Sequence, residues 1–196
     1  MAKATRRLTT ALAVSATLLT ARAATAAGAS DRASIVLHVD DFSGLLPVDV
    51  ASAAAVARRV FDRAAIRTIW VYGRIRPLRT DGALHLKVLV LSKEMAEQKI
   101  VSDGVQDNVL GQAAKDCGRA YIFSHRIAAL ATRSQRPIGE LLGWVIAHEV
   151  GHLVLPENSH SPIGIMSSSL NLRSATLPAF TVEQMAAIRQ RLTSAN

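Results

Sequence analysis

Cysteine is almost absent from this sequence, which contains one thiol, Cys117, in 196 residues. A single cysteine cannot form a disulfide within its own chain, so the fold must depend on its apolar core and on any metal that it binds. Hydrophobic residues make up 49% of the chain, enough for a sizeable core. The composition therefore excludes a small scaffold that is held together by disulfides.

Long apolar runs are also missing, because no stretch reaches about eighteen uninterrupted apolar residues, the length that spans a bilayer. The most apolar region near the start, residues 8–20, is shorter than that and follows three basic residues. Small residues at 24–27 complete an order that is typical of a secretory signal peptide. We therefore expect residues 1–27 to be a signal peptide. The mature protein is expected to be exported, to the periplasm or the extracellular space, without stable membrane insertion.

The sequence also lacks a strong excess of charge of one sign once the expected signal peptide is removed. The formal net charge is +8, and four basic residues lie in that peptide, so residues 28–196 carry +4, being 8 minus 4. The basic segment 73–79 has no interleaved aromatic residues and predicts a solvated loop. No nucleic-acid partner is expected. The 169 residues that follow the signal peptide, being 196 minus 27, are enough for one domain.

The most informative stretch is His148-Glu149-Val150-Gly151-His152. On an α-helix, residues four apart lie one turn above each other, so His148 and His152 can direct two imidazoles at one metal ion. Glu149 then lies beside the metal and not on it. A zinc ion held by two or three imidazoles keeps a position open for water, and a neighbouring carboxylate can accept a proton from that water as it attacks a carbonyl. The pattern favours metallopeptidase chemistry.

The residues around this stretch favour the helix that the pattern needs. Residues 138–154 are compatible with a helix, with Pro137 suited to its first turn and Pro156 placed to end it. Apolar side chains surround the two histidines on nearly all sides, so we expect the helix to be buried. A buried imidazole or carboxylate needs a partner, because an unpaired polar group in apolar surroundings is costly. A metal ion supplies one.

The stretch resembles the metzincin clan of zinc peptidases, whose signature is a HExxH helix, a glycine turn, a third zinc-binding His and a downstream Met in a tight turn. His148, Glu149 and His152 match the first part of that signature. The spacing then departs from it, because Leu155 and Asn158 stand where the family has its Gly and its third His. The resemblance implies Zn2+ as the cofactor, Glu149 as the general base and a peptide or protein as the substrate.

The next histidine, His160, comes two residues later than in the family and is predicted to be the third zinc ligand. Pro156 ends the helix, and Asn158 tolerates the left-handed backbone that a return turn needs. Glu157 is the competing ligand, although its shorter tether to the helix makes a return to the metal harder. Met166, six residues after His160, resembles the Met of the Met-turn and is expected to pack under the site.

Hydrophobic periodicity in the rest of the chain predicts an α+β fold. Strands are predicted at residues 34–40, 66–72, 84–91 and 119–125, and helices at 47–65, 92–99 and 181–193. The connection 101–118 is expected to be irregular, and residues 181–184 form a capping box. With the HExxH helix, this order resembles the metzincin core. We expect a single domain over 28–196, with a twisted mixed sheet of about four strands, an N-terminal helix, the central HExxH helix and a C-terminal helix.

Together these features predict a secreted zinc peptidase in which three histidines hold the metal and Glu149 activates water. By the resemblance, strand 119–125 is expected to form the rim of the cleft, where an extended substrate adds as a further strand. The shifted spacing leaves a second hypothesis open: a secreted binding module with a structural or vestigial zinc site, in which Glu157 fills the fourth position. The remaining histidines lie on predicted strands and are expected to have core or surface roles: His38, His85 and His125.

Overall fold

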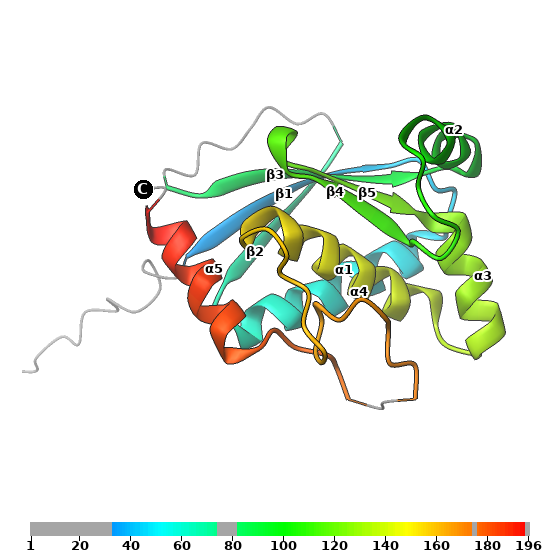
Figure 1. Ribbon diagram of the computed structural model, residues 1–196. Helices are drawn as coiled ribbons and strands as arrows, with labels where there is room; N and C mark the ends of the chain where they lie inside the picture. Colours follow the sequence, from blue (N-terminus) through cyan, green and yellow to red (C-terminus); the bar gives the residue numbers. More distant parts are fainter. Residues whose placement is uncertain (1–32, 74–81, 174–175, 195–196) are drawn as a thin grey trace, which may run out of the picture. The chain divides into compact units, whose positions relative to one another are not determined.

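Within residues 33–73, 82–173 and 176–194, which the computed structural model describes, five strands form one mixed sheet. The strands are β1 (Ser34–Asp41), β2 (Arg67–Tyr72), β3 (Leu84–Leu91), β4 (Gly111–Ala114) and β5 (Arg119–Phe123). Their order is β2-β1-β3-β5-β4 (Figure 1). β4 pairs antiparallel with β5, whereas the other neighbouring strands are parallel. The expected signal peptide and most of the basic segment 73–79 lie outside the described residues.

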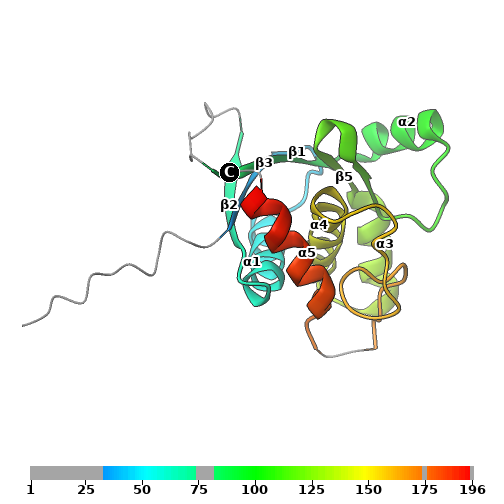
Figure 2. The same cartoon turned by 60° about the vertical axis from the view of Figure 1, so that its left-hand side comes forward.

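Four of the five described helices form the main core with one face of this sheet, whereas the helix at residues 93–103 packs in a separate cluster with Leu91 and Phe123 on the other face. The helices are α1 (Pro47–Arg63), α2 (Lys93–Asp103), α3 (Ser124–Ser134), α4 (Ile138–Val154) and α5 (Val182–Ser194). α1 and α4 lie side by side, and α4 also contacts β3, β4 and β5 (Figure 1 and Figure 2). α5 adds Ile188 and Leu192 to the same core. Among the described residues, no helix combines the length and apolarity needed to cross a membrane.

Helix α4 has the bounds that its sequence predicts, and 13 of its 17 residues are buried. Its burial depends partly on Gly143, where α1 approaches closely. A Cβ at that position would lie 2.6 Å from the carbonyl oxygen of Ala53 and 2.6 Å from the Cβ of Val56. The absence of a side chain therefore lets two helices pack directly on each other, and the prediction of a helix that is buried nearly all round is confirmed.

The chain between residues 92 and 125 differs from the sequence-based expectation. The segment 101–118, expected to be irregular, contains the end of α2, strand β4 and a 3-10 turn at Lys115–Cys117. The predicted strand 119–125 ends at Phe123, where α3 begins. The prediction that this strand forms the rim of the cleft is wrong, because β5 lies between β3 and β4 and the edge strand is β4. The sequence of β4, Gly-Gln-Ala-Ala, has little β propensity, so pairing with β5 must stabilise it.

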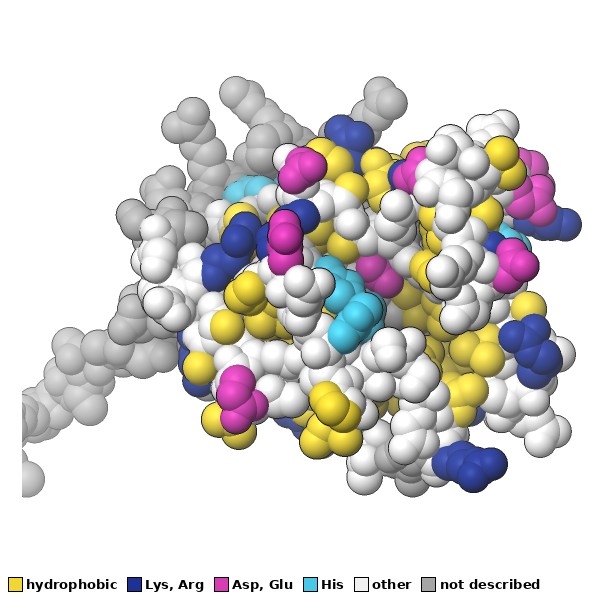
Figure 3. All heavy atoms as spheres, viewed as in Figure 1, with side chains coloured by type: hydrophobic (Ala, Val, Ile, Leu, Met, Phe, Trp, Pro, Cys, Tyr) yellow, Lys and Arg dark blue, Asp and Glu magenta, His cyan; other side chains and the backbone are white. Residues whose placement is uncertain are grey.

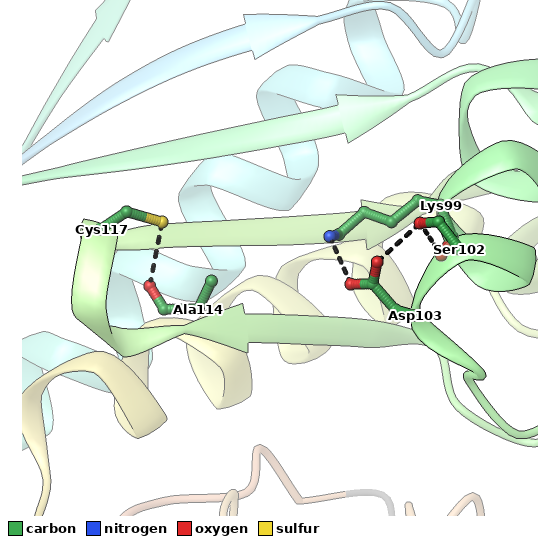
Figure 4. A network of polar contacts seen from close by, with 5 residues as sticks. All are labelled: Lys99, Ser102, Asp103, Ala114 and Cys117. Carbon is green, nitrogen blue, oxygen red and sulfur yellow. Dashed lines mark hydrogen bonds and ion pairs between the residues drawn. The ribbon is translucent and has the colours of Figure 1, made fainter.

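Polar contacts anchor the chain at both ends of β4 (Figure 4). Before the strand, the ammonium group of Lys99 lies 2.7 Å from the carboxylate of Asp103 and 3.9 Å from the ring centre of Tyr121 on β5. The contact with Lys99 lowers the pKa of Asp103 to about 2. After the strand, the exposed Cys117 places its Sγ 3.5 Å from the carbonyl oxygen of Ala114. The contact of Lys99 with Tyr121 links α2 to the sheet, and the contact of Cys117 is local to the β4–β5 turn.

We expect the substitution Gly143→Ala to destabilise the protein. Alanine would add about 1 kcal/mol of helix propensity, but its methyl group would lie 2.6 Å from a backbone oxygen of α1. Overpacking costs about 1–3 kcal/mol, and a clash with a backbone oxygen favours the upper part of that range, about 2–3 kcal/mol, so we expect the free energy of unfolding to fall by about 1–2 kcal/mol. Urea denaturation measures it. An unchanged or higher free energy of unfolding would contradict the close packing of α1 on α4.

Candidate metal centre

Three histidine side chains converge near the C-terminal end of α4. His148 and His152 project from successive turns of the helix, and His160 comes from the loop that follows it. The Nε2 of His152 lies 3.0 Å from the Nε2 of His148 and 3.1 Å from the Nε2 of His160. One nitrogen of each ring lies within 4.8 Å of the others, and no other such group of three metal-ligating side chains occurs among the described residues.

Hydrogen bonds at the opposite ring nitrogens orient two of these imidazoles. The Nδ1 of His148 lies 2.7 Å from the carbonyl oxygen of Ile165. A carbonyl can only accept, so this Nδ1 carries the proton and the Nε2 keeps a free lone pair. The Nδ1 of His152 lies 3.2 Å from the hydroxyl oxygen of Ser159. Outer partners of this kind fix the tautomer and the ring orientation of metal-binding histidines.

The protonation state of the rings favours a cation between them. Burial, and then the charges of the two other imidazoles and Lys115, lower the pKa of His152 to about 4. Burial also lowers the pKa of His148. Both rings are therefore neutral near pH 7, and their facing lone pairs repel each other unless a proton or a metal ion lies between them. Tetrahedral zinc with ligands at about 2.0–2.1 Å places two nitrogens about 3.3 Å apart, so the group fits this ion.

Glu149 contributes a buried carboxyl group beside the histidines, with 7% of its surface exposed. Burial raises its pKa to about 8, and a hydrogen bond from the backbone of Ala113 opposes this shift. Gly111 and Ala113 both lie on the edge strand β4. A Cβ at Gly111 would lie 2.7 Å from the Cγ of Glu149 and 2.9 Å from its Oε1. Any larger residue at position 111 would therefore displace the carboxyl group.

A cleft of about 930 Å³ opens beside these groups. Figure 3 shows the surface hollowed next to the His side chains, with hydrophobic side chains in the hollow. One face of α3 lines the cleft, with Ala129 and Leu130 between Arg126 and Arg133. β4 and the three histidines line it as well. A ligand in the cleft can therefore contact the metal centre and the free edge of the sheet together.

Met166 is completely buried and packs against α4 at Gly151, where an added Cβ would lie 2.5 Å from the Sδ of Met166. The chain turns tightly at this point, because the backbone N–H of Ser167 donates to the carbonyl of Gly164 at 3.3 Å. Gly164 has a φ of +84°, which favours glycine. Ile165, within the same turn, provides the carbonyl that orients the first histidine. The turn thus supports the site by packing and by one hydrogen bond.

The structure brings together His148, His152 and His160 and leaves Glu157 out of their group. Glu157 is exposed and lines the cleft. Asn158 has a φ of +55°, the left-handed conformation that the sequence predicts for the return turn. The longer connection to the third histidine is therefore accommodated by a residue that tolerates this conformation.

Several contacts near and outside the site could not be read from local patterns. His38 on β1 and His85 on β3 stack with ring centres 5.2 Å apart, and the Nε2 of His38 lies 2.9 Å from the Nδ1 of His85. His125 belongs to α3 and not to a strand, so that prediction is wrong. The sequence around Gly111 gives no sign that this residue faces α4. The sequence marks Gln184 as part of a capping box and gives no sign of its link to the site.

We expect the metal-free protein to lose stability as the pH rises from about 6.5 to about 8. The carboxyl of Glu149 has a pKa of about 8 in the folded protein and 4.5 as the ordinary value. Its contribution to stability is complete below pH 4.5 and is lost as the pH rises through 8, because the unfolded chain releases this proton first. The lowered pKa of His152 has the opposite effect below pH 6.5. There the protein loses stability as the pH falls from 6.5 to about 4, because the unfolded chain binds this proton first.

The window of about 1.5 pH units corresponds to about 2 kcal/mol of unfolding free energy. Urea denaturation at several pH values in the presence of a chelator measures it. The variant Glu149→Gln cannot titrate at this position and should show a flat profile between pH 6.5 and 8. Equal slopes in the two proteins would show that Glu149 does not retain its proton.

No protein-family model and no curated protein sequence matches this chain. Among solved structures, the chain is similar to archaemetzincin from Methanopyrus kandleri, with a TM-score of 0.54 and 15% identity, over 82% of this chain and 97% of that one. It is also similar to a zinc-dependent peptidase from Methanocorpusculum labreanum strain Z, with a TM-score of 0.50 and 17% identity, over 79% of this chain and 99% of that one. The chain therefore has the metzincin-like α+β fold that its sequence predicts.

Proposed function

We propose that this protein is an exported, zinc-dependent peptidase. The observation that carries the proposal is the convergence of three imidazoles on one point, beside a buried carboxyl group and within a cleft along the edge of the sheet. Two proteins of similar fold, an archaemetzincin and a zinc-dependent peptidase, support this reading of the site. The substrate would be a peptide or a protein.

The metal would be held by His148, His152 and His160. Bound zinc supplies a Lewis acid, which polarises the scissile carbonyl and makes the attacking water more acidic. Glu149 accepts the proton of that water on its carboxylate and delivers it to the leaving amine. In the metal-free protein burial raises its pKa to about 8, so that it is mostly protonated at pH 7, and the positive charge of a zinc ion beside it would favour the carboxylate that acts as the base. The contact with Gly111 keeps this carboxylate in one place.

Strand β4 is the part of the cleft that we propose binds the substrate backbone. It is an edge strand, and its residues Gly111 and Ala113 line the cleft beside Glu149. Unpaired backbone groups of an edge strand can bind an extended chain as a further strand. Apolar residues elsewhere in the cleft, such as Leu130 and Val145, suit an apolar side chain of that peptide.

We also propose that residues 1–27 direct export and are then removed. The support is the order of basic residues, a short apolar stretch and small residues in that segment. The first described strand begins at Ser34, so removal of residues 1–27 would leave every described element intact. The enzyme would then act in the periplasm or outside the cell.

The alternative of a binding module with a structural zinc site has less support. Structural zinc sites are usually closed by four protein ligands, which leave no position for water. Among the described residues, three side chains form the metal-ligating group, and Glu157 is not one of them. A site with three protein ligands leaves a position open, as hydrolysis requires.

The proposal is tested by cleavage of a mixed peptide library with zinc-loaded protein comprising residues 28–196. We expect the wild type to cut and Glu149→Gln to lose at least about a hundredfold in rate, because an amide cannot accept the proton. Both proteins should bind one zinc ion per chain, measured by elemental analysis. Glu157→Gln is the matched control, since this exposed carboxylate lines the same cleft and lies outside the metal group.

Equal cleavage rates in the wild type and Glu149→Gln would refute the role of Glu149. Loss of zinc from the Glu157→Gln variant would show that Glu157 is a zinc ligand. If the wild type binds zinc and leaves every peptide in the library intact, the binding module becomes the better interpretation.

A further inference from the structure

The third histidine is the least constrained part of the metal centre. His160 is exposed and lies in a connection without helix or strand, eight residues after His152. A ligand on such a loop loses conformational freedom when it binds a metal, which weakens binding unless the fold already holds the loop in place. The contacts on either side of His160 therefore decide how well the site is formed.

The side chain of Gln184, in the first turn of α5, contacts both neighbours of His160. Its Nε2 donates to the carbonyl oxygen of Ser159 at 2.9 Å and to the hydroxyl oxygen of Ser161 at 3.1 Å. Its Oε1 accepts the backbone N–H of Thr181 at 3.0 Å. Gln184 is 9% exposed, so these bonds are largely shielded from water. Both donor hydrogens and the acceptor of the amide are thus engaged.

The two serines transmit this contact to the rest of the site. The hydroxyl oxygen of Ser159 lies 3.2 Å from the Nδ1 of His152, the second predicted ligand. The backbone N–H of Ser161 donates to the carbonyl of Met166 at 3.0 Å. The loop around His160 is therefore fixed by α5 on one side and by the tight turn at Met166 on the other.

We propose that Gln184 is a positioning residue for the metal centre, which holds the loop of the third histidine in the orientation that zinc requires. One amide group serves two purposes, because its oxygen caps α5 and its nitrogen holds the loop. This inference rests on the proposed metal site, but it concerns metal affinity and not the chemical step. Gln184 lies on the C-terminal helix and touches no reacting atom.

The test separates the two purposes of the amide by substitution. Gln184→Glu keeps an oxygen for the N–H of Thr181 and removes the N–H donors to the carbonyl of Ser159 and the hydroxyl of Ser161. Gln184→Met removes the same bonds without adding a charge, and also the bond from the N–H of Thr181, and it decides the question if Gln184→Glu fails to fold. Thr181→Ala removes the reciprocal capping bond from the N–H of Gln184, 3.3 Å, and leaves the contacts with the loop intact. Gln190→Glu places the same charge change at an exposed position of α5.

Zinc affinity is measured on residues 28–196 by competition with a chromogenic chelator, and the folding of each metal-free variant by circular dichroism. We expect Gln184→Glu and Gln184→Met to bind zinc about 10–100-fold more weakly than the wild type. Thr181→Ala and Gln190→Glu should bind within about twofold of it. In cobalt-substituted protein, the visible spectrum should change in the two Gln184 variants and stay as in the wild type in the two controls.

Wild-type zinc affinity in folded Gln184 variants would overturn the inference, and so would an equal loss in Thr181→Ala. Either result would leave the proposed peptidase standing, provided that the wild type cuts peptides. Conversely, weaker zinc binding in the Gln184 variants of a protein that cuts no peptide would uphold the inference and refute the peptidase.

Discussion

Burial of α4 is the constraint on which the site depends. A polar group left unpaired in a helix that is covered on nearly all sides costs about 1–3 kcal/mol, and apart from the site only the ring nitrogen of Trp144 is left so among the described side chains of α4. Its polar groups are met by separate segments of the chain: the carbonyl of Ile165, the hydroxyl of Ser159 and the backbone of Ala113. Within the described part of the chain, the Nε2 atoms of the histidines then have only each other as neighbours in hydrogen-bonding range. A cation among them satisfies these remaining groups.

The site combines residues on a closely packed helix, α4, with a residue on a loop. Glu149 and two histidines stand on α4, where the close approach of Gly143 to α1 and of Gly111 to Glu149 leaves little room for movement. His160 stands on an exposed loop, and its position depends on polar contacts with α5 and with the turn at Met166. The proposed base is therefore placed by packing, and the proposed third ligand is placed by hydrogen bonds.

Much of the fold could be predicted because, in most segments, the local sequence pattern favours the same helix or strand that distant contacts stabilise. α4 keeps its predicted bounds, and the predicted capping box is confirmed by reciprocal bonds between Thr181 and Gln184. β4 could not be predicted, because a Gly-Gln-Ala-Ala strand exists only through its partner β5. Local patterns show which residues can form a helix or a strand, but the contact of Gly111 with Glu149 and the pairing of His38 with His85 depend on how distant strands are arranged.

The central claim is that three imidazoles hold one zinc ion with a position left open. X-ray absorption spectroscopy at the zinc edge tests this most directly, on zinc-loaded wild type and on His160→Ala. We expect one zinc per chain, with three imidazole nitrogens at about 2.0–2.1 Å and one further light ligand in the wild type, and with two imidazoles in the variant. Three imidazoles in His160→Ala, or no stoichiometric zinc in the wild type, would contradict the account.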